Sequence, residues 1–127
     1  MATQTFRQLL VWQKAHESVL AVYKYTNSFP KTEIYALTSQ LKRAAVSIAA
    51  NIVEGYKKRG KADKARLMNI ARGSIEECQY YFVLSNDPGY GKNDHLVILL
   101  NEIGKMLESY ISKILSSNSN FYILCSI

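Results

Sequence analysis

The sequence predicts an all-α protein, an antiparallel up-down-up-down four-helix bundle of one domain. In four segments of the 127 residues, apolar side chains recur every three or four positions, as on one face of a helix. No segment sustains the alternation typical of a strand. The two prolines, Pro30 and Pro88, and two of the glycines, Gly55 and Gly60, separate these segments by short breaks. Short connections favour helices that run in opposite directions beside one another.

We expect these helices at roughly residues 7–28, 32–55, 61–85 and 93–116. Their core-facing residues are expected to be Leu9, Trp12, Ala15, Val19, Val22 and Tyr23; Ile34, Leu37, Leu41, Ala45, Ile48 and Ile52; Leu67, Ala71, Ser74, Cys78 and Tyr81, flanked by Ile70, Ile75 and Phe82; and Leu96, Leu100, Ile103, Leu107, Tyr110 and Ile114. Gly55 is expected to end the second helix in a left-handed cap. Asn93 or Asp94 can cap the fourth helix. The tail, 117–127, breaks the helical pattern; folding back, pairing with another chain and disorder all stay open.

The sequence contains none of three common arrangements of catalytic or metal-binding residues. There is no G-x-S-x-G, no Glu-x-x-His pair and no C-x-x-C, and the two histidines, His16 and His95, fall on different predicted helices. Cys78 and Cys125 have no histidine nearby, so a metal site is not expected. The sequence therefore predicts a non-enzymatic protein with no catalytic residues, no metal site and no cofactor.

The sequence gives no sign of export or of membrane insertion. Its start, MATQTFRQLLVWQKAHE, has no continuous apolar core before its charges. The longest uncharged apolar stretch, AAVSIAANIV at 44–53, is about half of what a bilayer span needs. We therefore expect a cytoplasmic protein without a membrane partner.

The stretch GYKKRGKA, at 55–62, begins like a phosphate-binding loop, G-x-x-x-x-G-K. That loop needs a strand before it and a Ser or Thr after the lysine, whose hydroxyl holds the magnesium ion. Here Ala62 takes the hydroxyl position and an alanine-rich helical segment precedes the loop. A nucleoside triphosphatase is therefore not expected.

The same stretch holds most of the net charge of +6. Residues 57–66 carry six positive charges and one negative charge, whereas the rest carries ten positive and nine negative. Clustered cations of this kind bind nucleic-acid phosphates with little sequence preference. The predicted nucleic-acid-binding residues are Lys57, Lys58, Arg59, Lys61, Lys64 and Arg66, with Tyr56 to stack on a base, and Lys42, Arg43 and Arg72 as weaker candidates. The alternative is a solvated loop that serves solubility on a protein-interaction scaffold.

The second predicted helix has a second apolar side, away from its core stripe. Its residues are Tyr35, Val46, Ala49, Ala50 and Val53. This side is either the edge of a wide core face or a homo-oligomer interface in which the alanines let backbones approach closely. A polar strip of Gln40, Arg43, Ser47, Asn51 and Glu54 is either solvated or fixes the register between subunits by hydrogen bonds.

Four segments carry a resemblance to a known family: VWQKA (11–15), FP (29–30), LTSQLKRAAVSIAANIVEGY (37–56) and ARGSIEE (71–77). The sequence resembles the bacterial four-helix bundle proteins called 23S rRNA intervening-sequence proteins. Departures are mild: Ala49 stands where the family often has proline, and Val53 where it often has alanine.

The resemblance implies a helical bundle and a symmetric oligomer, with a pentamer expected. Members are encoded in insertions within ribosomal RNA genes, and similar bundles are accessory proteins of reverse transcriptases, where basic surfaces are thought to meet nucleic acid. The family has no established enzymatic activity and no agreed molecular function. We expect an oligomeric bundle that binds RNA or DNA; the alternative is a scaffold or accessory subunit, for example of a reverse transcriptase, with no nucleic-acid role of its own.

Overall fold

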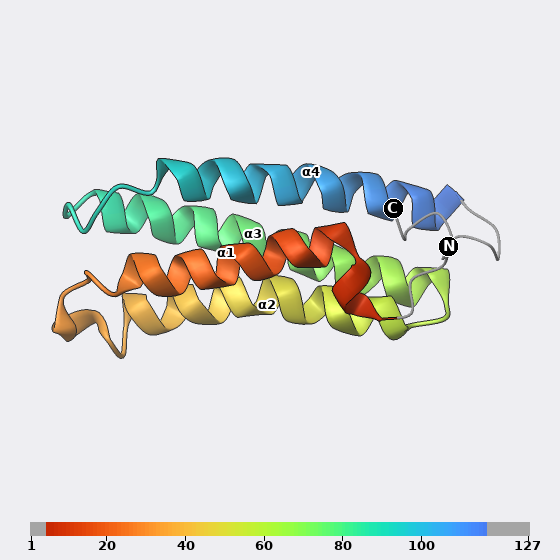
Figure 1. Cartoon of the computed structure of the whole chain (residues 1–127), viewed down its shortest axis with the longest axis horizontal. Coiled ribbons are helices and arrows are strands. Elements are labelled where there is room, and N and C mark those ends of the chain that lie inside the picture. The colour runs from red at the N-terminus through yellow and green to blue at the C-terminus, as the bar shows by residue number, and fades with distance from the viewer. Residues whose placement is uncertain (1–4, 117–127) are drawn as a thin grey trace.

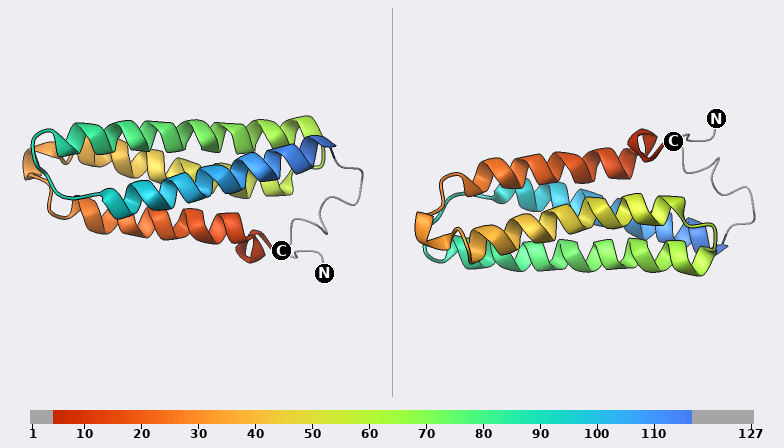
Figure 2. Two further views of the ribbon diagram at one scale, coloured as in Figure 1. Left: turned by 90° about the horizontal axis from the view of Figure 1, so that it is seen from above. Right: turned by 90° about the horizontal axis from the view of Figure 1, so that it is seen from below.

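The computed structural model describes residues 5–116, and these form a bundle of four long helices (Figure 1). The helices are α1 (Leu10–Thr26), α2 (Leu37–Lys57), α3 (Lys61–Asn86) and α4 (Asp94–Ser116), with short 3-10 helices η1 (Phe6–Gln8) and η2 (Lys31–Glu33). Each helix runs opposite to the one before it, and α4 returns beside α1, as the views from above and below show (Figure 2). The predicted fold class is confirmed, and residues 5–116 contain no strand.

The core forms where the apolar faces of the four helices meet. The six core residues expected in α4 are all buried, as are those expected in α2 from Leu37 onward. In α1 the buried face is turned relative to the expected one: Val11 and Ser18 are buried, whereas Tyr23 is 44% exposed. An apolar residue in α1 therefore does not by itself mark the core side.

The second helix starts later than expected, at Leu37 instead of residue 32. Residues 31–33 form η2, a turn follows, and the Oε1 atom of Glu33 accepts a hydrogen bond from the backbone N–H of Leu37 at 3.4 Å. This bond satisfies one of the donors that a helix leaves open at its start. Ile34, expected in the core, lies in the turn and is exposed.

Gly55 does not form the expected left-handed cap. The helix continues to Lys57, and the glycines with positive φ in residues 5–116 are Gly89 and Gly91. Gly55 is buried against α3 instead: a Cβ there would lie 2.7 Å from Cε of Met68 and 3.3 Å from Cβ of Leu67. The glycine therefore serves the close approach of two helices.

A buried polar network ties the α3–α4 connection to α1, at the end of the bundle opposite the α2–α3 connection. The hydroxyl of Tyr25 lies 2.7 Å from Oγ of Ser85 and accepts a hydrogen bond from Nδ2 of Asn93 at 3.0 Å. Nδ2 of Asn93 also donates to the carbonyl of Phe82 at 3.1 Å. Asn93 directly precedes α4, and its side chain joins α1 and α3.

None of the four helices has the length and apolar character that a membrane crossing requires, over the residues that the structure describes. The tail expected at 117–127 lies outside those residues, as does Cys125.

Candidate nucleic-acid interface

The connection between α2 and α3 lies at one end of the bundle (Figure 1), and the residues in and beside it form an exposed cluster of positive charge. Lys57 is the last residue of α2 and Lys61 the first of α3, so the connection is only three residues long. Lys57, Lys58, Arg59 and Lys61 are all exposed. We refer to these four residues as the basic tip. Because two helix ends anchor so short a connection, the four charges stay close together.

Arg66 lies one turn into α3 from the basic tip and is also exposed. Its Nη2 lies 3.3 Å from Oδ1 of Asp63, in an ion pair between residues three apart on the helix. Exposed pairs of this kind contribute little to stability, and solvent screens them. Arg66 is thus available to a polyanion only in competition with Asp63.

Lys64 differs from its neighbours because it is buried, with 2% of its surface exposed. Its Nζ donates hydrogen bonds to the carbonyl of Gly55 at 2.9 Å and to that of Tyr56 at 2.8 Å. These carbonyls belong to the last turn of α2, where a helix leaves acceptors open and carries partial negative charge. The prediction that Lys64 contacts nucleic acid is therefore wrong: Lys64 stabilises the end of α2 from within α3.

Tyr56 was expected to offer its ring to a base, but it is half-buried and packs against the core. The ammonium groups of Lys57 and Lys64 lie 5.8 and 5.6 Å from the centre of its ring, within the range of cation–π attraction. The ring therefore already has partners within the chain, which argues against the stacking role.

Two further cations lie at the same end of the molecule as the basic tip. Arg7 belongs to η1, which packs against α2, and Lys113 belongs to the last turn of α4. The start of the described chain and the end of α4 both lie at the end of the bundle that carries the α2–α3 connection (Figures 1 and 2). Arg7 and Lys113 are both exposed. Charge counts along the sequence do not connect them with the basic tip, because they lie far from residues 57–66. The predicted topology was the signal that could have found them, since it brings the start of α1 and the end of α4 to this connection.

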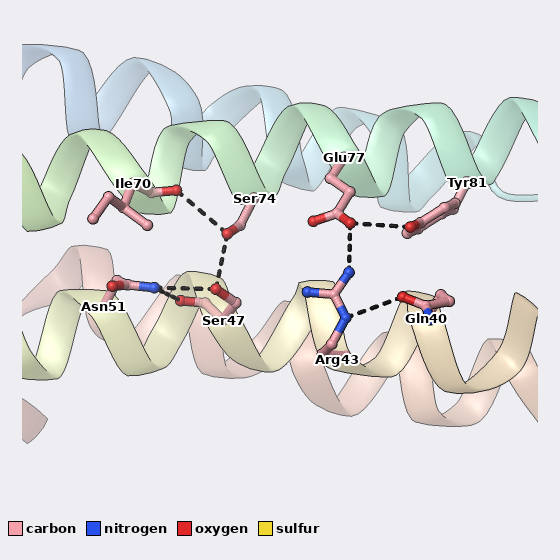
Figure 3. A network of polar contacts seen from close by, with 8 residues as sticks. All are labelled: Gln40, Arg43, Ser47, Asn51, Ile70, Ser74, Glu77 and Tyr81. Atoms are coloured by element: carbon pink, nitrogen blue, oxygen red, sulfur yellow. Dashed lines mark hydrogen bonds and ion pairs between the residues drawn. The ribbon is translucent and has the colours of Figure 1, made fainter. Parts of the chain in front are cut away.

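The weaker candidate Arg43 belongs to a ladder of polar contacts between α2 and α3 (Figure 3). Its guanidinium donates to the carboxylate of Glu77, which also accepts from the hydroxyl of Tyr81 at 3.0 Å. The hydrogen bond to Glu77 raises the pKa of Arg43. Burial, followed by the hydrogen bond to Glu77, raises the pKa of Tyr81. Arg43 therefore already has a carboxylate partner within its own chain.

The ladder continues along α2 through Ser47 and Asn51. Oγ of Ser74 donates to Oγ of Ser47 at 2.9 Å, and Nδ2 of Asn51 donates to the carbonyl of Ser47 at 2.8 Å (Figure 3). Oε1 of Gln40 accepts from Nε of Arg43 at 3.1 Å. Four residues of the polar strip thus bond within the chain, where the sequence analysis had considered solvation or contacts between subunits. Glu54 is exposed.

The other weaker candidates lie on different sides of the bundle. Nζ of Lys42 lies 4.7 Å from the ring centre of Tyr23, so this lysine packs toward α1. Arg72 is exposed on α3, beside a groove of about 550 Å³ between α3 and α4.

The five residues expected at an oligomer interface do not lie on one surface of the structure. Val46 and Ala50 are exposed on α2 and Val53 is half-buried, so these three share an accessible face. Ala49 is only 9% exposed and belongs to the chain's own core, as the wide-core interpretation predicts for it. Tyr35 is 96% exposed, but it lies in the turn before α2 and not on the helix. Tyr35 therefore does not share a helical face with Val46, Ala50 and Val53, contrary to the prediction.

The groups with nucleophilic or metal-binding character are dispersed in the described part of the chain. Residues 5–116 contain no group of three or more His, Cys, Asp and Glu side chains that could hold a metal ion. Cys78 is buried in the core, and burial raises the pKa of its thiol to about 12. The imidazole of His16 stacks on Trp12 with the ring centres 5.0 Å apart. The basic tip thus remains the candidate site with the clearest chemistry.

Comparisons with known proteins agree with this architecture. A family model described as 23S rRNA-intervening sequence protein matches residues 7–109. The fold is similar to a crystal structure of a protein of unknown function from the S23 ribosomal protein family of Bacteroides thetaiotaomicron. That match has a TM-score of 0.72 and 26% identity, and covers 80% of this chain and 98% of that chain. No curated protein matches the sequence. Since the family model spans most of the bundle, the chain belongs to the family of 23S rRNA-intervening sequence proteins.

Proposed function

We propose that this protein binds the phosphate backbone of RNA or DNA through the basic tip and acts by binding, without catalysis, in the cytoplasm. The observation that carries the proposal is the exposure of four cations within five consecutive residues of a chain that is otherwise nearly balanced in charge. Cations that neutralise phosphates release the counterions condensed on them, which gives affinity with little sequence preference. Arg66, Arg7 and Lys113 extend the positive surface around the tip.

A titration by fluorescence anisotropy against labelled oligonucleotides tests the proposal. The variant Lys57→Glu/Lys58→Glu/Lys61→Glu reverses three charges of the tip. We expect it to abolish binding that the wild-type protein shows at 50 mM salt. Binding that persists in this variant would refute the proposal, as would the absence of binding by the wild type.

The matched control reverses exposed lysines at the opposite end of the bundle. Lys31 and Lys92 are exposed there, in η2 and in the α3–α4 connection. Lys31→Glu/Lys92→Glu should leave most of the affinity intact, because these lysines lie far from the basic tip. An equal loss in the control would show that only the total charge matters.

We propose further that copies of the chain assemble, so that several basic tips act together. Val46, Ala50 and Val53 supply an accessible face of small apolar residues on α2, and Tyr35 exposes a large aromatic ring nearby in sequence. The family resemblance favours a pentamer. Light scattering should give a multiple of the 14.4 kDa monomer mass, and Val46→Glu should reduce it. A monomeric wild type would remove this part of the proposal.

A second candidate function is a protein-interaction scaffold, including an accessory subunit of a reverse transcriptase. A pocket of about 350 Å³ favours it, at the end opposite the basic tip. Its lining includes Leu37, Tyr81, Leu84, Pro88 and Tyr90. Pull-down from nuclease-treated lysate would support the scaffold if a partner is retained by the wild type and lost with Leu84→Arg. Partners that are lost on nuclease treatment favour nucleic-acid binding.

A further inference from the structure

We propose that the ligand of the basic tip is a duplex, recognised through its phosphates, rather than a single strand held by base stacking. This inference rests on the proposed function and names the class of nucleic acid. Proteins that bind single strands combine a cationic groove with aromatic rings on which bases stack, and each such stack contributes about 1–3 kcal/mol. The aromatic rings near the tip therefore decide between the two ligands.

The ring closest to the tip in sequence is Tyr56, and its surroundings are already occupied. It is half-buried, packs against the core and has the ammonium groups of Lys57 and Lys64 within 6 Å of its ring centre, at 5.8 and 5.6 Å. Lys64 is itself fixed by its two hydrogen bonds to the end of α2. To stack on a base, the ring would have to leave a packed position.

Among the residues that the structure describes, Phe6, Trp12 and His16 at this end of the bundle pack against one another, and Tyr110 of α4 is buried. The edge of Phe6 meets Trp12, with ring centres 4.9 Å apart, and Trp12 stacks in parallel on His16 at 5.0 Å. Phe6 and Trp12 are half-buried. Aromatic contacts of this geometry are favourable in themselves, so a base would have to displace an existing partner.

Lys64 also keeps the charge of the tip available. The carbonyls at the end of a helix carry partial negative charge, and nearby cations interact with them favourably. Here a buried ammonium satisfies the carbonyls of Gly55 and Tyr56, so the exposed lysines are not needed for this role. Within residues 5–116, the tip therefore presents exposed cations, and the ring nearest to them in sequence, Tyr56, already has partners in the chain.

A cluster of this kind gains more from a duplex than from a single strand. Double-stranded DNA carries one negative charge for about every 1.7 Å of its axis. The logarithm of the binding constant falls with the logarithm of the salt concentration, with a slope of about 0.9 per neutralised phosphate for a duplex and about 0.7 for a single strand. Where base stacking contributes nothing to the affinity, the higher charge density of the duplex makes it the tighter ligand of the two. The structure thus assigns the tip to the outer backbone of double-stranded RNA or DNA.

The experiment compares a labelled 20-base-pair duplex with its single strand, as DNA and as RNA, at 50 to 200 mM salt. We expect the duplex to bind at least about fivefold more tightly, and four contacts predict a loss of roughly 100-fold in duplex affinity over this range. Trp12 is the only tryptophan of the chain, so its fluorescence reports on stacking at the Phe6–Trp12–His16 cluster. It should not change on binding.

Two variants separate the contributions. Lys58→Gln should weaken the binding of both ligands, whereas His16→Ala should leave both affinities unchanged. Equal or tighter binding of the single strand, whichever ring is responsible, overturns the inference, and so does quenching of Trp12 by bound nucleic acid. If neither ligand binds at 50 mM salt, the proposed function itself fails, which distinguishes the two failures.

Discussion

The ammonium group of Lys64 lies 2.9 Å from the carbonyl oxygen of Gly55 and holds the end of α2 from the first turn of α3. The contact crosses the short connection that carries the basic tip, so this lysine connects the stability of the fold to the geometry of the site. The lysines of the basic tip, Lys57, Lys58 and Lys61, are exposed, and the same residue type thus has two roles within eight positions.

Replacement of Lys64 by methionine should cost stability rather than affinity. The substitution keeps most of the buried chain length but removes both hydrogen bonds of Nζ, so the carbonyl of Gly55 retains the backbone N–H of Lys58 at 3.2 Å and that of Tyr56 loses the ammonium donor. This loss should cost roughly 1–3 kcal/mol. Urea unfolding measures this loss, and anisotropy measures the affinity of the folded variant. Lys61→Met is the control and should show the reverse pattern. If Lys64→Met left the stability unchanged and reduced the affinity, Lys64 would have to be a nucleic-acid contact and not a support of α2.

Substitutions at Gly55 should depend strongly on the size of the new side chain. A single methyl group meets chiefly Cε of Met68, the flexible end of a side chain. Gly55→Ala should therefore change stability by less than about 1 kcal/mol, because the gain in helix propensity offsets the crowding. Gly55→Val adds branches toward Leu67 and should cost about 1–3 kcal/mol or more. Thermal unfolding measures both.

Gly104 provides the control for Gly55, since it lies within α4 and a Cβ there would meet no atom within 4 Å. Gly104→Ala should stabilise the protein by up to about 1 kcal/mol. If Gly55→Val were as harmless as Gly104→Ala, the close approach of α2 and α3 would not depend on the glycine.

The ion pair between Arg43 and Glu77 should contribute little on its own. Both side chains are partly exposed, and such pairs typically couple by about 0.2–1 kcal/mol. A double-mutant cycle with Arg43→Gln and Glu77→Gln measures the coupling in urea. It should shrink further at 1 M salt, because solvent ions screen exposed charges. A coupling that salt leaves unchanged would contradict this description.

Removal of the Asn93 side chain should destabilise the end of the bundle opposite the basic tip. Asn93→Ala removes the two buried hydrogen bonds that Nδ2 donates, to the hydroxyl of Tyr25 and to the carbonyl of Phe82, and leaves Oγ of Ser85 as the remaining side-chain partner of both. The loss of two buried bonds should cost roughly 1–3 kcal/mol. Asn101→Ala is the matched control, because Asn101 bonds Gln79 at the surface. It should change stability by no more than about 0.5 kcal/mol. Similar losses in both variants would indicate that burial of the network is unimportant.

The buried thiol of Cys78 should make stability fall at high pH. Burial raises its pKa from an ordinary value near 9 to about 12, so the folded state keeps a proton that the unfolded chain releases. This contribution is complete below pH 9 and is lost progressively as pH rises toward 12. We expect the free energy of unfolding of Cys125→Ser to fall more steeply between pH 9 and 12 than that of Cys78→Ala/Cys125→Ser. Parallel curves would contradict the shift.

The predictable part of the fold is the part that depends on periodicity. Apolar spacing identified the core face of α4 completely, because a long amphipathic helix has one way to bury its stripe. The start of α2 was less predictable, since a carboxylate of Glu33 and a 3-10 turn decide it locally. The frequency of glycine at helix ends predicts a terminal role for Gly55. Its constraint in the structure is the close approach to Met68, which exists only in the folded chain.

In the candidate site, too, some features are predictable from the sequence and others depend on the folded chain. A run of lysines and arginines locates an exposed connection, and four of the six predicted cations do form the basic tip. Charge counts cannot show that Lys64 turns inward, because its hydrogen-bond acceptors belong to the preceding helix. Charge counts also cannot show that Arg7 and Lys113 lie near the basic tip, because only the folding of the chain brings η1 and the last turn of α4 to this end of the bundle.

The polar ladder between α2 and α3 has a consequence for folding accuracy. Purely apolar helices can slide past one another by a turn and still bury similar surface. Here a shift of α3 along α2 by one turn would separate Arg43 from Glu77 and Ser47 from Ser74 at the same time. A misaligned hairpin would thus lose several polar partners at once. The ladder therefore specifies the register of α3 along α2. It destabilises packings that are shifted by one turn more than it stabilises the native packing.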